Sequence, residues 1–228
     1  MKSQISNPLK PIARESVEDR VTEALRELIV TGQLAEGTPL VQRDLAVRLG
    51  VSQTPIRHGL TELQRLGMVA VGDTGRAVVS RLTREDFEEI YAARRGLEAL
   101  AARVGTEAMT EADVAEMEAW LISLLELAEK ADVDGYLRAR WEFHATCYRA
   151  ARRPRLLSEV ERLFWRSERY NRLVLDSKQR FSRSVSNYHK LYEACRAHDP
   201  EGAERAIDAQ MRWAVESLGS SLPSESDE

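Results

Sequence analysis

The sequence predicts a mainly α-helical protein, with an N-terminal winged helix-turn-helix followed by an antiparallel all-helical bundle. Apolar residues recur at helical spacing along almost the whole chain of 228 residues. Only residues 68–79 combine β-prone runs with a glycine-containing turn, which is typical of a hairpin. Glycine and proline are few, at 12 and 7 residues, which argues against a turn-dense all-β fold.

The predicted first domain covers residues 1–80 and opens with a polar arm of about 14 residues. Ser16 and Asp19 have the spacing of a capping box, so a helix should begin there. Gly32 closes this helix. Its apolar stripe comprises Val17, Val21, Ala24, Leu25 and Leu28.

Two shorter helices follow, separated by a tight turn. Gly50 stops the first of them, and Ser52 is a suitable N-cap for the second. Pro55 is tolerated within the first turn, and Gly67 ends this second helix. The order helix, helix, turn, helix, hairpin is that of a helix-turn-helix with a wing.

The predicted second domain covers residues 81–228 and contains six helices. Thr83 and Thr110 open sequences that resemble capping boxes, and Asp199 with Pro200 opens the last helix. Residues 220–228 are polar and acidic, which predicts a disordered tail. The six apolar stripes begin at Phe87, Val114, Tyr136, Leu156, Phe181 and Ala203.

Several classes of protein are excluded by what the sequence lacks. It has no run of 18 apolar residues and no secretory leader, so we expect a cytoplasmic protein without a membrane span. Cys147 and Cys195 form no Cys-x-x-Cys pair and are expected to be small buried hydrophobes, the alternative being a reactive or metal-binding thiol. An enzyme using His144 and Cys147 is a rival interpretation, but no carboxylate lies at a fixed offset to orient the histidine.

The net charge of −4 argues against a nucleic-acid binder when it is averaged over the chain. The charge is unevenly distributed, however, at +1 in residues 1–80 and −5 in the remainder. A weakly positive first domain is compatible with base-specific DNA binding.

The second helix of a helix-turn-helix lies in the major groove, where its N-terminal residues reach base edges. Here Gln53 can bond adenine, and Arg57 can bond guanine or phosphate. Arg43, on the preceding helix, is placed to hold the DNA backbone. The predicted DNA contacts are Arg43, Ser52, Gln53, Thr54 and Arg57, with Gly75 and Arg76 on the wing. The rival is a helical ligand-binding or scaffold protein that never contacts DNA.

Five segments of the first domain resemble the winged helix of GntR-type transcription regulators. They are residues 28–40 (LIVTGQLAEGTPL), 43–46 (RDLA), 49–57 (LGVSQTPIR), 60–63 (Leu-x-x-Leu) and 66–69 (LGMV). Departures from the family pattern are Glu36 for proline, Gln53 for arginine, and His58-Gly59 for Glu-Ala. The change at Gln53 predicts an altered operator preference at one base position.

The second domain resembles the FadR subgroup of that family, whose C-terminal domain binds effectors and dimerises. The resemblance rests on Arg94-x-x-Leu97-Glu98, Phe143-His144, Ala150-Ala151-x-x-Pro154 and Glu193-Ala194-x-Arg196-x-x-Asp199. It implies a homodimer whose two winged helices bind the half-sites of a near-palindromic operator in double-stranded DNA. Repression released by a small-molecule effector is the commoner behaviour of the family.

Many members of the subgroup hold a divalent metal through one aspartate and three histidines. Those positions fall here on Arg140, His144, Tyr188 and Gln210, so one ligand of four remains. A guanidinium repels a cation and cannot ligate it. We therefore predict no metal and no other cofactor, with His144 and the out-of-register His189 as the only residual candidates.

Arg140 could replace the metal by binding a carboxylate effector directly. The predicted effector-binding residues are Arg94, Arg140, His144, Tyr188 and Gln210. The alternative for His144 is an ordinary core histidine bonded to Tyr148, Tyr188 or Gln210. A series of arginines at positions 162, 166, 169 and 172 lines either this pocket or a dimer surface, and the sequence does not choose between them.

Overall fold

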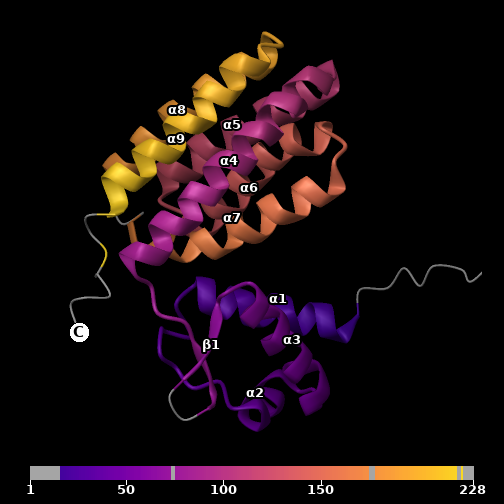
Figure 1. Ribbon diagram of the computed structural model, residues 1–228, viewed down its shortest axis with the longest axis vertical. Helices are drawn as coiled ribbons and strands as arrows, with labels where there is room; N and C mark the ends of the chain where they lie inside the picture. Colours follow the sequence, from indigo (N-terminus) through magenta and orange to yellow (C-terminus); the bar gives the residue numbers. More distant parts are fainter. Residues whose placement is uncertain (1–15, 73–74, 175–177, 220–221, 223–228) are drawn as a thin grey trace, which may run out of the picture.

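The computed structural model describes residues 16–72, 75–174, 178–219 and 222. This part of the chain forms a small N-terminal head and a larger helical bundle. In Figure 1 the head is drawn below the bundle. The predicted arm, residues 1–14, and the predicted tail apart from Leu222 lie outside the described residues. Leu222 itself is buried against the bundle, unlike the tail that the sequence predicts.

The head contains helices α1 (Val17–Val30), α2 (Gln42–Leu49) and α3 (Gln53–Arg65). Its wing is the antiparallel pair β1 (Val69–Val71) and β2 (Ala77–Val79), in which Val69 pairs with Val79 and Val71 with Ala77. Pro39 adds an isolated bridge to Val78, which ties the connector before α2 to the wing. The order of elements is the predicted one.

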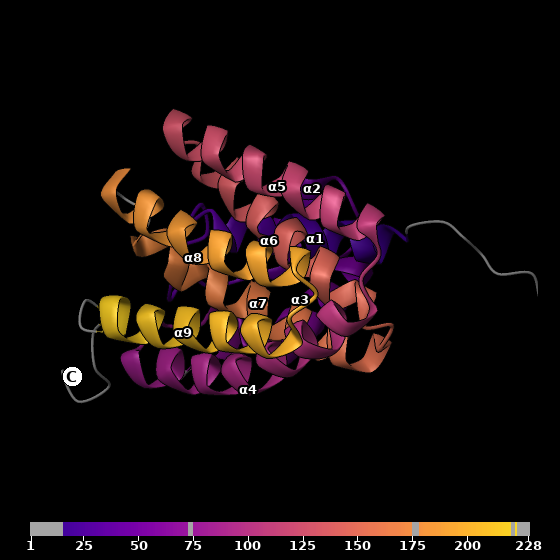
Figure 2. The same ribbon diagram turned by 90° about the horizontal axis from the view of Figure 1, so that it is seen from above.

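The bundle consists of six long helices, and no membrane-crossing helix is found in the described part of the chain. In order they are α4 (Arg84–Ala108), α5 (Glu111–Lys130), α6 (Val133–Ala150), α7 (Pro154–Val174), α8 (Lys178–Arg196) and α9 (Pro200–Leu218). Figures 1 and 2 both show α9 running alongside α4. In Figure 1, α7 is the bundle helix that lies next to α1 of the head.

Helix starts follow the predicted local rules. Ser16 and Thr110 form full capping boxes with Asp19 and Asp113. Thr83 and Asp199 also accept a backbone N–H at the start of their helices, and Gly50 takes the left-handed conformation that ends α2. Ser52 differs, because it occupies the N-cap position of α3 but its side chain makes no capping bond.

Two separate hydrophobic cores hold the structure together. One lies within the head and gathers residues from Val21 to Val79. The other fills the bundle and gathers residues from Leu82 to Leu222. Only Trp165 of α7 packs against both cores among the described residues, so this side chain marks the joint between head and bundle. The side chains of Phe181 and Val185, predicted for the bundle core, lie outside the described set.

Candidate functional site

The recognition surface of the head is built by the amphipathic pattern of α3. Ile56, Leu60 and Leu63 are buried toward the head core, which fixes the opposite side of the helix in solvent. Gly59 permits this packing, because an added Cβ would lie 3.2 Å from Thr22 Oγ1 of α1. The predicted contacts of this helix, Ser52, Gln53, Thr54 and Arg57, are all exposed.

The other predicted DNA contacts also lie on the surface of the head. Arg43 is exposed on α2 and makes only a loose ion pair with Asp44, at 3.5 Å from Nε to Oδ1. Gly75 has φ +72, a conformation that favours glycine, and Arg76 beside it is exposed. Figure 1 shows α2 at the end of the head that faces away from the bundle.

The predicted effector-binding residues are brought together in the interior of the bundle. Their exposed fractions are 1% for Arg94, 6% for Arg140, 0% for His144 and Tyr188, and 7% for Gln210. They come from α4, α6, α8 and α9, so residues more than a hundred positions apart meet in one place. Spatial convergence of these side chains was expected, but the carboxylate partners of Arg94 and Arg140 were not.

A continuous chain of hydrogen bonds links three of the helices, α4, α6 and α9. Arg94 Nε donates to Glu98 Oε1 at 2.6 Å, and the Tyr148 hydroxyl donates to Glu98 Oε2 at 2.8 Å. His144 Nδ1 lies 3.4 Å from the Tyr148 hydroxyl, and His144 Nε2 lies 3.3 Å from Gln210 Nε2. Since the Tyr148 proton is committed to Glu98, His144 Nδ1 donates and His144 Nε2 accepts from Gln210.

His144 is therefore a neutral imidazole whose two ring nitrogens are both hydrogen-bonded. Burial, reinforced by the positive charges of Arg140 and Arg94, holds the pKa of His144 well below its usual range. Tyr188 contacts it edge to face, with ring centroids 5.4 Å apart. The bonded core histidine weighed as an alternative from the sequence describes this geometry, with Tyr148 and Gln210 as partners.

Arg140 differs from its expected state, because it is already paired. Its guanidinium contacts Glu168 of α7, whose Oε1 also accepts from Asn171 Nδ2 at 3.3 Å. Burial alone would lower the pKa of Arg140, but the Glu168 carboxylate overcomes this and raises it. A buried cation is costly without a counter-charge, which is the physical reason for the partner. The guanidinium carbon also lies 4.6 Å from the Phe164 ring centroid.

The two carboxylates, Glu98 and Glu168, are the residues that sequence reasoning did not assign. Glu98 lies four residues after Arg94, and this spacing on one helix could have signalled the pair. Glu168 is the single acid within the stretch Arg166–Arg172, and no local pattern relates it to Arg140, which is 28 positions away. That pairing exists only because α6 and α7 pack together.

Three polar atoms in this interior have no hydrogen-bond partner among the described residues: Arg140 Nε, Glu168 Oε2 and Gln210 Oε1. Buried polar atoms are nearly always bonded, so unsatisfied ones call for an explanation such as a polar ligand. One is a donor on a cation and two are acceptors. A small molecule with a carboxylate and a hydroxyl group has the complementary atoms.

The metal site common in the FadR subgroup does not fit these residues. Arg140 occupies the aspartate position and directs a cation into the interior, and Tyr188 is buried where a histidine would stand. His189 is exposed on α8 and points away from that interior. Across residues 16–72, 75–174 and 178–219, no group of three potential metal-ligating side chains is found.

The two cysteines are packed as small core residues. Cys147 and Cys195 are both free and fully buried, with their sulfurs 3.7 Å apart, and Thr106 Oγ1 lies 3.4 Å from Cys195 Sγ. The hydrogen bond with Cys195, together with burial, raises the pKa of the Cys147 thiol well above its usual range. A thiol that keeps its proton is a poor nucleophile, which disfavours the enzyme interpretation.

Arg166 and Arg169 of the α7 series contact the region where the head meets the bundle, which neither alternative from the sequence foresaw, whereas Arg162 pairs with Glu159 on α7 itself. Arg169 donates from both terminal nitrogens to Ser80, at 2.8 Å to Oγ and 2.7 Å to the carbonyl. Arg166 pairs with Asp86 and lies against Gly67, where an added Cβ would come within 2.7 Å of Arg166 Cζ. Arg172 pairs with Asp134 of α6. Arg169 thus ties α7 to the residue after the wing, and Arg166 ties α7 to the start of α4.

The exposed winged helix and the polar bundle interior together define a DNA-binding transcription regulator. The comparisons with protein families agree: residues 17–79 match the model "Bacterial regulatory proteins, gntR family", and residues 89–212 match the FCD domain. The chain belongs to the GntR family and carries an FCD domain, the combination of the FadR-like subgroup. It is a regulator and not an enzyme.

The similarity to known transcription regulators extends over most of the chain. The transcriptional regulator McbR of Escherichia coli K12 is 26% identical over 198 residues, covering 86% of this chain and 90% of McbR. A probable D-xylose utilization operon transcriptional repressor of Paenarthrobacter nicotinovorans is 28% identical over 203 residues, covering 87% of each. The solved McbR/YncC structure superposes with a TM-score of 0.80 at 25% identity, covering 90% of this chain and 98% of that one.

Proposed function

We propose that the protein is a homodimeric repressor whose affinity for a double-stranded operator is controlled by a small carboxylic acid bound inside the bundle. The observation that carries the effector half of the proposal is the set of unsatisfied buried atoms around Arg140. The family assignment supports the DNA-binding half. The operator contacts we propose are those predicted from the sequence, on α2, α3 and the wing.

The effector would bind in the polar interior by accepting hydrogen bonds from the guanidinium group of Arg140. Its carboxylate can accept from Arg140 Nε, which makes no other hydrogen bond within the described chain. A hydroxyl or second oxygen can then reach Glu168 or Gln210. The cost of desolvating the effector is offset because Arg140 is already held in place by Glu168 and Phe164.

Helix α7 is suited to carry the signal from the interior to the head. About one turn of it presents Ser167 and Glu168 to the buried arginines, and Arg166 and Arg169 to the joint. A ligand that bonds both Arg140 and Glu168 would shift α7 and with it the hydrogen bonds to Ser80. Operator affinity then changes because the effector favours one placement of the two heads.

Operator binding is tested by selecting bound duplexes from a random pool with the full-length protein. We expect an enriched, near-palindromic sequence bound by two chains, with an affinity that falls steeply as salt is raised. The matched comparison is a scrambled duplex of the same length and composition. Equal affinity for the selected and scrambled duplexes would contradict DNA recognition, and a monomer in the complex would contradict the dimer.

The effector site is tested by isothermal titration of a panel of small mono- and dicarboxylic acids, with and without EDTA. We expect binding that EDTA does not change and that Arg140→Gln weakens by about tenfold or more, because one charge-assisted pair is lost. Arg149→Gln, an exposed arginine on the same helix, should bind as the wild type does. Binding abolished by EDTA would restore the metal and contradict the proposal.

A further inference from the structure

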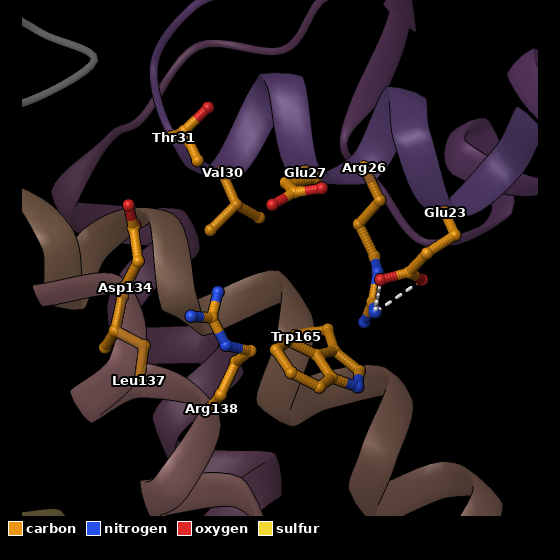
Figure 3. Close-up of a pocket in the computed structure, with 9 residues that line it drawn as sticks. All are labelled: Glu23, Arg26, Glu27, Val30, Thr31, Asp134, Leu137, Arg138 and Trp165. Carbon is orange, nitrogen blue, oxygen red and sulfur yellow. Dashed lines mark hydrogen bonds and ion pairs between the residues drawn. The ribbon is translucent and has the colours of Figure 1, made fainter.

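A cleft separates the head from the bundle on one side of the joint (Figure 3). It holds about 80 Å³ of space between the second half of α1, the start of α6 and the middle of α7. Specific pockets for small molecules occupy roughly 300–1,000 Å³, so this cleft is smaller and leaves much of a bound ligand in solvent. Its lining residues are Glu23, Arg26, Glu27, Val30, Thr31, Asp134, Leu137, Arg138 and Trp165.

The apolar part of the cleft is a wall with a flat aromatic surface. Trp165 contributes its half-buried indole, and Val30 and Leu137 flank it from the head and from the bundle. The Arg26 guanidinium covers the Trp165 ring at 3.9 Å from its centroid, and Glu23 holds it there. The tryptophan is therefore fixed in place before any ligand arrives.

The charged part of the cleft contains two groups that the protein leaves available. Arg26 is neutralised by Glu23, and Asp134 is neutralised by Arg172. Glu27 and Arg138 form no ion pair with any residue that the structure describes. Figure 3 shows the Glu27 carboxylate and the Arg138 guanidinium facing the cleft from opposite walls, one on the head and one on the bundle.

We propose that this cleft is a binding site for a small zwitterion with an apolar side chain, namely a free α-amino acid of the aromatic or branched aliphatic type. Arg138 binds the carboxylate of the ligand, and Glu27 binds its ammonium group. The side chain packs on Val30, Leu137 and the part of the Trp165 indole that Arg26 leaves uncovered. A simple anion would be repelled by Glu27 and a simple cation by Arg138, so the pair selects for both charges in one molecule.

The site goes beyond the proposed repressor function and is separate from the effector site in the interior. None of the nine lining residues belongs to the network around His144 and Arg140. Because the walls come from the head and from the bundle, a bound amino acid bridges the two. It would thereby strengthen the joint on the side that Arg166 and Arg169 do not hold.

The test is isothermal titration of the full-length protein, without DNA, using L-phenylalanine, L-tryptophan and L-leucine. We expect at least one of them to bind with a Kd on the order of 0.1–1 mM, the strength typical of so few ligand atoms. Phenylacetate and phenethylamine, which carry one charge each, should bind about tenfold more weakly or worse. Absence of saturable binding by all three amino acids overturns the proposal.

Variants locate the binding. Arg138→Gln and Glu27→Gln are surface changes and should each weaken amino-acid binding about tenfold, while the charge-swapped double variant Glu27→Arg/Arg138→Glu restores part of it. Arg149→Gln on the same helix should bind normally. Arg140→Gln should also bind amino acids normally; if it alone abolishes binding, the ligand occupies the interior site and the cleft assignment is wrong.

Discussion

The head and the bundle place their arginines in opposite environments. In the head, Arg43, Arg57 and Arg76 are exposed and are positioned by the element that carries each of them. In the bundle, Arg94 and Arg140 are buried, and each is held by a carboxylate. A surface arginine is available to a partner as it stands, whereas a buried one can accept a ligand only by sharing or exchanging its counter-charge.

The largest expected effect tests the buried half of this comparison. Glu168→Met leaves Arg140 as an uncompensated buried cation, so the free energy of unfolding should fall by about 4 kcal/mol. The double variant Arg140→Met/Glu168→Met should recover most of that loss. Urea denaturation followed by tryptophan fluorescence is suitable, because all four tryptophans lie in the bundle. In the head, Arg43→Met should change stability by less than about 0.5 kcal/mol. Equal losses of unfolding free energy for Glu168→Met and Arg43→Met would contradict the difference between buried and exposed arginines.

Close helix contacts differ between the two regions in a second way. An added Cβ at Gly105 of α4 would lie 2.1 Å from the backbone oxygen of Cys147, so Gly105→Ala should destabilise the bundle by about 3 kcal/mol. Gly96 on the same helix has nothing within 4 Å, and Gly96→Ala should stabilise it by about 1 kcal/mol. Gly59→Ala, at the contact between α1 and α3 of the head, should change the stability by an amount between those of Gly105→Ala and Gly96→Ala. Thermal melts of the three variants give the order, and a tolerated Gly105→Ala contradicts the α4–α6 packing.

The buried histidine predicts a pH dependence specific to the bundle. His144 stays neutral in the fold because its pKa is depressed, while in the unfolded chain it gains a proton below about pH 6.5. The unfolded state then binds more protons, so stability is lost as pH falls, by up to about 1.4 kcal/mol per pH unit. Above pH 6.5 the contribution is constant. His144→Gln should show a shallower slope between pH 6.5 and 5, measured by urea denaturation at a series of pH values.

The smallest expected effect concerns helix starts. Thr110 forms a capping box in the bundle, so Thr110→Ala should cost about 1 kcal/mol. Ser52 makes no capping bond in the head, and Ser52→Ala should cost less than about 0.5 kcal/mol while weakening operator binding. Chemical denaturation separates the two. A Ser52→Ala loss as large as that of Thr110→Ala would place its hydroxyl in the fold and not at the DNA.

The sequence predicted what local patterns determine. The order of the helices, the wing and the exposure of Gln53 and Arg57 follow from periodicity, glycine stops and a motif confined to some 60 residues. The pairing of Arg140 with Glu168 could not be predicted, because it depends on which turn of α7 packs against α6. The contact of Arg169 with Ser80 is likewise a property of how the bundle sits on the head.

The central claim is that exposed side chains of α3 read the bases of the operator, while α2 and the wing contact its backbone. It is tested most directly by comparing Arg57→Ala with the wild type for affinity toward the selected duplex and a scrambled one. Arg57 is exposed, so the melting temperature should not change, while the preference for the selected duplex should fall by about tenfold or more. An unchanged preference in the folded variant would contradict this account of recognition.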